Sequence, residues 1–178
     1  MTEFNYDKLM QRIGEFVVCF QWIEDKFRSI GWLIEDPNRT VWPPRTLRSL
    51  NNRDLLNAVE VKYCSLMDTL NIDDADGRKT AFSELVGVCH EIRKFRNSFL
   101  HSAFIEVKAG REIMGILRSN PKLTFDPSTG TPEFDQEALT EESIMSQMEE
   151  IAQVSMTLCH IYTQLLHWTP FAPVNNEP

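Results

Sequence analysis

The chain has 178 residues, of which 26 are acidic and 18 are basic, so its net charge at pH 7 is −8. This acidic balance excludes a surface that binds nucleic acid indiscriminately, but it leaves room for a local basic cleft. The length suits one domain over residues 1–178 with a core of its own. No stretch approaches the ~18 uninterrupted apolar residues of a membrane span, so we expect no membrane contact.

The four cysteines fall in four different predicted helices, and no two of them form a C-x-x-C pair. Such spacing is typical of small buried side chains in a reducing compartment rather than of disulfides or a zinc site. The first residues lack the basic segment and apolar run of a secretory signal. The seven glycines are scattered and form no phosphate-binding loop. We expect a cytoplasmic protein with no metal and no other cofactor.

The first predicted helix covers residues 7–35. Its apolar residues recur at alternating steps of four and three, which is the seam of a helix packed lengthwise against others. Trp22 and Trp32 lie off this seam, so the helix should bury a second face against another helix or another chain. The seam consists of Leu9, Ile13, Phe16, Phe20, Ile23, Phe27, Ile30 and Ile34.

A proline at position 37 ends this helix, and two further prolines favour an extended connection over residues 36–50. A second helix is predicted from a cap at Asn51 or Asn52. The acidic turn after it, residues 71–78, has a likeness to a calcium-binding loop that fails in register. The stripe of the second helix consists of Leu55, Leu56, Val59, Tyr63, Leu66, Met67 and Leu70.

The third predicted helix covers residues 79–100, and its apolar stripe includes a charged residue, Arg96. A permanently charged guanidinium at a core-facing position is costly unless something pairs with it. One explanation is a structural ion pair with a carboxylate of the first helix, Glu24 or alternatively Asp25. The other is a solvated or phosphate-lined cleft. The stripe consists of Phe82, Leu85, Cys89, Ile92, Arg96 and Phe99.

Polar side chains gather beside this arginine at the end of the same helix. Asn97 and His101 are four residues apart, so on a helix they share a face, together with Arg93 and His90. Arg93 and Lys94 add positive charge at the same place. An arginine, a carboxamide and an imidazole at one helix end suit the handling of a phosphodiester. His90 is either a further cleft residue or an ordinary surface histidine.

The periodicity changes after the third helix. Residues 104–118 alternate in the manner of a β-hairpin that turns around Ala109 and Gly110, and the composition of residues 119–139 predicts a loop. A fourth long helix is predicted from Thr140, and the tail 168–178 is expected to be non-helical. We therefore predict an all-α fold: a four-helix up-down bundle with a small β-hairpin inserted between the third and fourth long helices.

The sequence from Arg96 to Ser102, R-N-S-F-L-H-S, lies at the end of the third helix and resembles the HEPN superfamily. Catalytic members of that family carry an arginine followed by a polar residue, with a histidine a few positions later. The resemblance implies a metal-independent endoribonuclease that works as a homodimer and is often the toxin of a toxin–antitoxin pair. RNA and an antitoxin protein are therefore the implied partners.

The resemblance also implies roles at the motif. His101 would supply or accept the proton in the attack of a ribose 2′-hydroxyl, and Arg96 would stabilise the charge on the phosphate. Asn97 would orient the imidazole or bind the phosphate, and these three residues form the catalytic set. DNA, which lacks the 2′-hydroxyl, should be spared. The residues expected to contact the substrate are Arg93, Lys94 and Ser102, and those expected to support the site are Glu24 and His90.

The motif carries one geometric requirement. On a regular helix Arg96 and His101 lie about 140° apart, so the helix must end or kink near residues 97–101 for both to act on one phosphate. The alternative function is a non-catalytic dimeric module that binds a protein partner or a nucleotide, with Arg96 in a structural ion pair. The enzyme needs both residues exposed in one cleft, whereas the module would leave His101 buried or away from Arg96.

Overall fold

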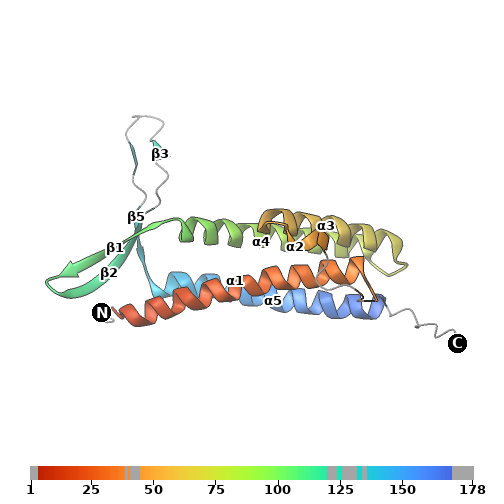
Figure 1. The fold of residues 1–178 in the computed structure, drawn as a ribbon, viewed down its shortest axis with the longest axis horizontal. Coiled ribbons are helices and arrows are strands. Elements are labelled where there is room, and N and C mark those ends of the chain that lie inside the picture. The colour runs from red at the N-terminus through yellow and green to blue at the C-terminus, as the bar shows by residue number, and fades with distance from the viewer. Residues whose placement is uncertain are drawn as a thin grey trace. The chain divides into compact units, whose positions relative to one another are not determined.

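The computed structural model of this chain describes residues 4–38, 40, 45–119, 124–125, 132–133 and 136–169. The described part is mostly helical, with a small three-stranded antiparallel sheet (Figure 1). Its helices are α1 (Tyr6–Glu35), α2 (Arg45–Arg48), α3 (Asn52–Thr69), α4 (Ala75–Leu100) and α5 (Glu141–Trp168). Its strands are β1 (Ala103–Ala109), β2 (Glu112–Ser119), β3 (Thr124–Phe125), β4 (Pro132–Glu133) and β5 (Gln136–Leu139).

The long helices lie where the sequence predicts them, with differences at their ends. Helix α3 begins after Asn51, whose side chain accepts a hydrogen bond from the backbone N–H of Asp54 at 3.0 Å. Helix α4 begins four residues earlier than predicted, at Ala75. The short helix α2 lies in the segment predicted to be extended, and residues 41–44 of that segment are outside the described residues. Helix α5 includes Trp168, and residues 170–178 of the predicted tail are also outside them.

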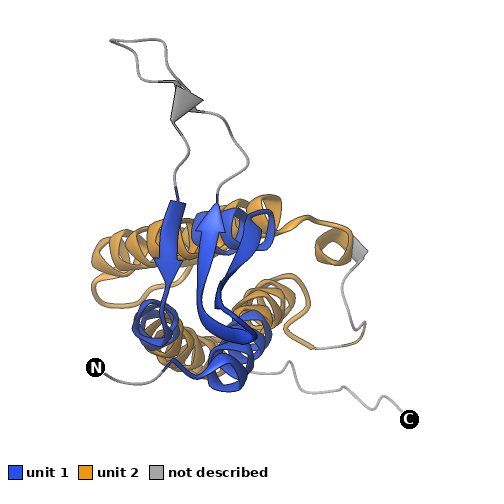
Figure 2. Ribbon diagram, turned by 90° about the vertical axis from the view of Figure 1, so that its left-hand side faces the viewer, with its two compact units in different colours: residues 1–19, 94–150 blue, residues 20–93, 151–178 orange. Residues whose placement is uncertain are grey.

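The described chain divides into two compact units (Figure 2). We call residues 1–19 and 94–150 the sheet unit, and residues 20–93 and 151–178 the helix unit. The boundaries fall within α1, α4 and α5, so each of these helices contributes residues to both units.

The helix unit has an aromatic and aliphatic core. The Phe82 ring stacks on Tyr63 with ring centroids 4.1 Å apart and lies 6.1 Å from Phe27. Helix α2 packs closely on α1 because Gly31 has no side chain: a Cβ atom there would lie 2.5 Å from Cδ1 of Leu47, which is itself buried. These contacts agree with the predicted stripes of the first three long helices.

The sheet of the sheet unit has the strand order β1-β2-β5 and is antiparallel throughout. Strands β1 and β2 form the predicted hairpin, and its turn contains Gly110 at φ +64°, a conformation that favours glycine. The sheet is larger than predicted, because residues 136–139 form strand β5 instead of a loop. Leu139 lies opposite Ile116, and both are 4% exposed, so one buried pair anchors this short strand.

Residues of α1 and α5 meet in the same unit. Leu9, Phe16 and Ile144 are buried there. The carboxylate of Glu141, at the start of α5, lies 2.9 Å from the Nζ atom of Lys8 and 3.4 Å from Nε of Arg12. In the described ranges, no helix combines the length and the apolar character required to cross a membrane.

Candidate functional site

Helix α4 ends inside the predicted window. Its last residue is Leu100, and the backbone N–H of His101 donates to the carbonyl oxygen of Asn97 at 3.1 Å. The next N–H, from Ser102, donates to the carbonyl oxygen of Phe99 at 3.2 Å, so the last turn tightens before β1 begins. His101 therefore stands one turn after Asn97, on the turn that joins α4 to β1, and its side chain is exposed.

The side chain of Arg96 is half-buried, and its Nη1 atom donates to Oδ1 of Asn97 at 3.0 Å. A hydrogen bond from a charged donor is stronger than one between neutral groups. Because Asn97 and His101 lie one turn apart on one face, this bond directs the guanidinium from the apolar stripe towards the face that carries the imidazole. We expect the guanidinium and the imidazole to lie closer together than the separation of about 140° between their backbone positions on a regular helix suggests.

Arg118 could not be selected from the sequence, yet its side chain is only 11% exposed and lies against the end of α4. Its Nη2 atom donates to Oγ of Ser98 at 2.8 Å, and its Nε atom donates to Oγ of Ser102 at 3.0 Å. Its Nη1 atom forms an ion pair with Glu137 of β5 at 2.6 Å. One guanidinium therefore connects strands β2 and β5 with the helix end that carries the motif.

Aromatic rings lie beneath this guanidinium. The Cζ atom of Arg118 is 5.4 Å from the ring centroid of Phe95 and 5.6 Å from that of Phe99, which is within range of a cation–π interaction. The Phe99 ring also packs against two other rings: its centroid is 5.8 Å from that of Phe16 in α1 and 5.2 Å from that of Phe104 in β1. The motif is consequently held on a packed aromatic base.

Ser102, predicted to contact the substrate, takes part in this arrangement. Its Oγ atom donates to the carbonyl oxygen of Ser98 at 2.7 Å and accepts from Arg118. The hydroxyl thereby satisfies one of the carbonyl groups left open at the helix end. Both contacts are within the protein, and they fix the residue next to His101.

The other predicted residues lie earlier in the chain. Arg93 is half-buried and Lys94 exposed, at consecutive positions of α4. In the helix unit, Glu24 accepts a hydrogen bond from the Asn52 side chain and lies 3.5 Å from Nη1 of Arg28. His90 and the Oδ1 atom of Asn57 are 2.9 Å apart. The structure thus gives Glu24 and His90 partners in the helix unit, and a link from Glu24 to Arg96 stays a prediction.

Cysteines and possible metal ligands were the other candidates for a functional site. All four cysteines are free thiols, and burial raises the pKa of Cys19 and of Cys64, which keeps these two thiols protonated near neutral pH. Among the described residues, no group of three or more histidine, cysteine, aspartate or glutamate side chains is placed to hold a metal ion.

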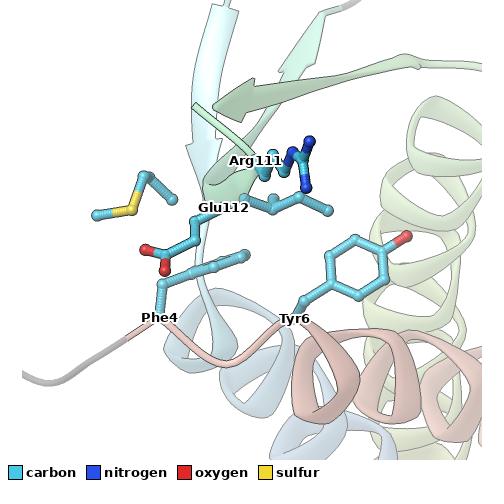
Figure 3. Close-up of a pocket in the computed structure, with 6 residues that line it drawn as sticks. Phe4, Tyr6, Arg111 and Glu112 are labelled. Atoms are coloured by element: carbon cyan, nitrogen blue, oxygen red, sulfur yellow. The ribbon is translucent and has the colours of Figure 1, made fainter. Parts of the chain in front are cut away.

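A cavity of about 410 Å³ lies at the turn end of the hairpin (Figure 3). Phe4 and Tyr6 border it from the start of the chain, and Arg111 and Glu112 border it from the hairpin, so it is lined by rings and by charges of both signs. His101 lies at the opposite end of β1, a strand length of about 20 Å away. The cavity is therefore not part of the motif.

No family model, no curated protein and no solved structure matches this chain. An assignment of function consequently depends on the residues and their geometry. At the end of α4, a cationic side chain, an amide and an exposed imidazole lie within a single helical turn of one another.

Proposed function

We propose that this chain is a metal-independent endoribonuclease of the HEPN type, built as a four-helix up-down bundle with the sheet inserted before its last helix. The observation that carries the proposal is the geometry at the end of α4. The guanidinium of Arg96 is bonded to Asn97, and Asn97 lies one turn before the exposed imidazole of His101. These groups suit the cleavage of an RNA phosphodiester by the 2′-hydroxyl of the adjacent ribose.

In the proposed reaction His101 accepts the proton of a ribose 2′-hydroxyl. The 2′-oxygen forms a bond to phosphorus, and the bond from phosphorus to the 5′-oxygen breaks. The imidazolium returns a proton to that 5′-oxygen, so the products are a 2′,3′-cyclic phosphate and a 5′-hydroxyl. Histidine is the side chain that most often performs such proton transfers in enzymes.

Arg96 would stabilise the negative charge that develops on the phosphate, because its guanidinium is a permanently charged hydrogen-bond donor. The amide of Asn97 would keep the guanidinium on the side of the imidazole, and its NH2 group would remain available to a phosphate oxygen. Arg93 and Lys94, on the preceding turn, would attract the RNA backbone.

The proposal includes a homodimer in which two motifs share one cleft, and an antitoxin protein as a further partner. The chain has a net charge of −8, so a single copy attracts RNA weakly. Two facing motifs would double the local positive charge. We further propose that the protein acts in the cytoplasm, as a toxin of a toxin–antitoxin or defence system.

The test is RNA cleavage in excess EDTA by the wild type and by His101→Ala. His167→Ala is the matched control, because His167 is also an exposed histidine at the end of a long helix. We expect cleavage of RNA but not of DNA, products that end in a cyclic phosphate, loss of cleavage in His101→Ala and full cleavage by His167→Ala.

Two results would contradict the proposal. Cleavage that survives His101→Ala would place the active site elsewhere. An absence of cleavage by the wild type on single-stranded and structured RNA, with no bound partner in the preparation, would favour the alternative. In that case the chain would be a non-catalytic module that binds a protein or a nucleotide, and Arg96 and Asn97 would have a structural role.

A further inference from the structure

Strand β1 is an edge of the sheet. In the described part of the chain it pairs with β2 alone, and the register shifts between Val107 and Lys108, where β2 has one extra residue, Met114. Since no residue is inserted in β1, its alternate residues direct backbone N–H and C=O groups away from the sheet. All seven of its residues are exposed. An uncovered edge strand is a template for pairing with another chain, and proteins commonly keep such an edge free by shortening it, by a β-bulge, or by proline or charged side chains on it.

The side chains of one sheet face add to this surface. Directly opposed residues point to the same side of an antiparallel sheet. Ile105, Leu117 and Ala138 therefore form a row across the three strands, next to the opposed pair Val107 and Gly115. Ile105 is 44% and Val107 40% exposed. A solvated sheet face normally carries polar side chains, so backbone groups and apolar side chains are here available to a partner at the same place.

We propose that β1 pairs antiparallel with β1 of a second copy of this chain, across a two-fold axis that passes through Val107. The two sheets then form one continuous sheet. In an antiparallel pair, two opposed residues either both direct their backbone groups towards the partner strand or both direct them away. In β1 these two kinds of residue alternate, in the same order in both copies, so opposed residues must differ by an even number of positions. The axis therefore passes through a residue and not between two residues.

The charges of β1 select which residue lies on the axis. An axis at Glu106 would set two carboxylates against each other, which is unfavourable. An axis at Ile105 would set Glu106 opposite Phe104 and form no ion pair between the copies. An axis at Val107 sets Glu106 of each copy opposite Lys108 of the other and sets Ile105 opposite Ala109. The strand is self-complementary in this register.

The proposed contact extends an ion pair that each copy already has. The Nζ atom of Lys108 lies 2.6 Å from Oε2 of Glu106, and these side chains are 52% and 41% exposed. Two copies would arrange four such charges in a square of alternating sign. Each charge would keep its neighbour on its own strand and gain an opposite charge across the axis.

This contact differs from the one by which two motifs would share a cleft. His101 precedes Val107 by six residues, so antiparallel pairing at Val107 places the two copies of His101 on the order of 40 Å apart. The inference therefore does not rest on the proposed ribonuclease activity. A chain that uses both contacts would assemble beyond a dimer.

The test exchanges the charges in two separate chains and measures the assembled mass by analytical ultracentrifugation at micromolar concentration. Glu106→Lys gives four positive charges at the axis, and Lys108→Glu gives four negative charges. We expect each variant to have a dissociation constant at least about tenfold higher and to sediment at half the wild-type mass. An equimolar mixture of the two sets positive opposite negative, so the wild-type mass should return.

Glu150→Lys is the control, because it makes the same change of charge at an exposed position of α5 and should keep the wild-type mass. Recovery on mixing also shows that the two variants are folded. The proposal is overturned if the wild type sediments as a single chain, because the edge would then be free for a different partner. It is equally overturned if either single variant keeps the wild-type mass, or if two variants with folded circular dichroism spectra fail to recover it.

Discussion

Replacement of Arg118 by alanine should weaken the end of α4 more than any single change at an exposed charge of the sheet unit. The side chain is 11% exposed, donates to Ser98, Ser102 and Glu137, and lies over two aromatic rings. Alanine removes all of these contacts at once. It also opens a space that water can enter only in part, because the Phe99 ring below is buried.

The magnitude follows from the individual contacts. Each of the two hydrogen bonds to the half-buried serines comes from a charged donor and contributes roughly 1.5 kcal/mol. The ion pair with Glu137, whose side chain is 58% exposed, contributes about 0.5 kcal/mol at most, because solvent screens it. The two ring contacts add ~1 kcal/mol. Water will replace part of the lost hydrogen bonding, so we expect Arg118→Ala to lower the free energy of unfolding by about 3 kcal/mol.

Urea denaturation measures this loss as a shift of the midpoint at an unchanged m-value. Arg118→Lys keeps the charge but has no fork of donors, so it should lose about half as much. Arg111→Ala removes an exposed arginine at the hairpin turn and should change the unfolding free energy by less than ~0.5 kcal/mol. Amide exchange of His101 and Ser102 should accelerate in Arg118→Ala. An Arg118→Ala protein as stable as Arg111→Ala would refute the reasoning.

Two further predictions concern contacts elsewhere in the units. Gly31→Ala should destabilise the protein by ~1–3 kcal/mol, because the new Cβ would lie 2.5 Å from Leu47. At Gly14 a new Cβ would meet no other side chain within 4 Å, so Gly14→Ala should stabilise the protein by up to ~1 kcal/mol. Thermal unfolding of both variants tests the two expectations. The hydrogen bond from Lys8 holds the pKa of Glu141 below its usual range. The contribution of Glu141 to the free energy of unfolding is therefore fully present above the pKa that this carboxyl has in the unfolded chain. It is lost as the pH falls through the lower pKa that the carboxyl has in the folded protein. The difference in unfolding free energy between wild type and Glu141→Gln should shrink from pH 7 to pH 3, and a difference that is constant with pH would contradict this.

The helices could be predicted from the sequence because their signals are local. The seam of α1 repeats over its whole length, and the period alone marks the helix from residue 7, one residue from its observed start at Tyr6. Helix α4 begins four residues before the predicted start, directly after Asp74, whose φ is 59°. Aspartate adopts a positive φ more often than most residues, but its presence alone does not identify a helix start. Strand β5 was missed because four residues with one buried side chain give no readable alternation.

In the candidate site, too, the local contacts could be predicted from the sequence and the long-range contacts could not. The contact of Arg96 with Asn97 joins consecutive residues, and the turn from Asn97 to His101 is one helical turn, so a sequence motif contains both. The contacts of Arg118 with Ser98 and Ser102 join residues 20 and 16 positions apart. They form only when the hairpin folds back on the helix, and the register of that hairpin decides which strand residue faces the motif. Strand β2 carries charges of both signs, and its sequence alone does not show that Arg118 is the residue that contacts the end of α4.

The position of His101 illustrates why such long-range contacts matter for a site that a short motif defines. The carbonyl groups of the last helical turn are satisfied by the residues that follow: that of Asn97 by the N–H of His101, that of Ser98 by the hydroxyl of Ser102, and that of Phe99 by the N–H of Ser102. The backbone on both sides of the imidazole is thus fixed, although the imidazole itself is exposed to solvent. A catalytic group needs this combination of access and fixed geometry. In this chain the motif supplies the exposed imidazole, and Arg118, which lies outside the motif, holds the helix end that fixes it.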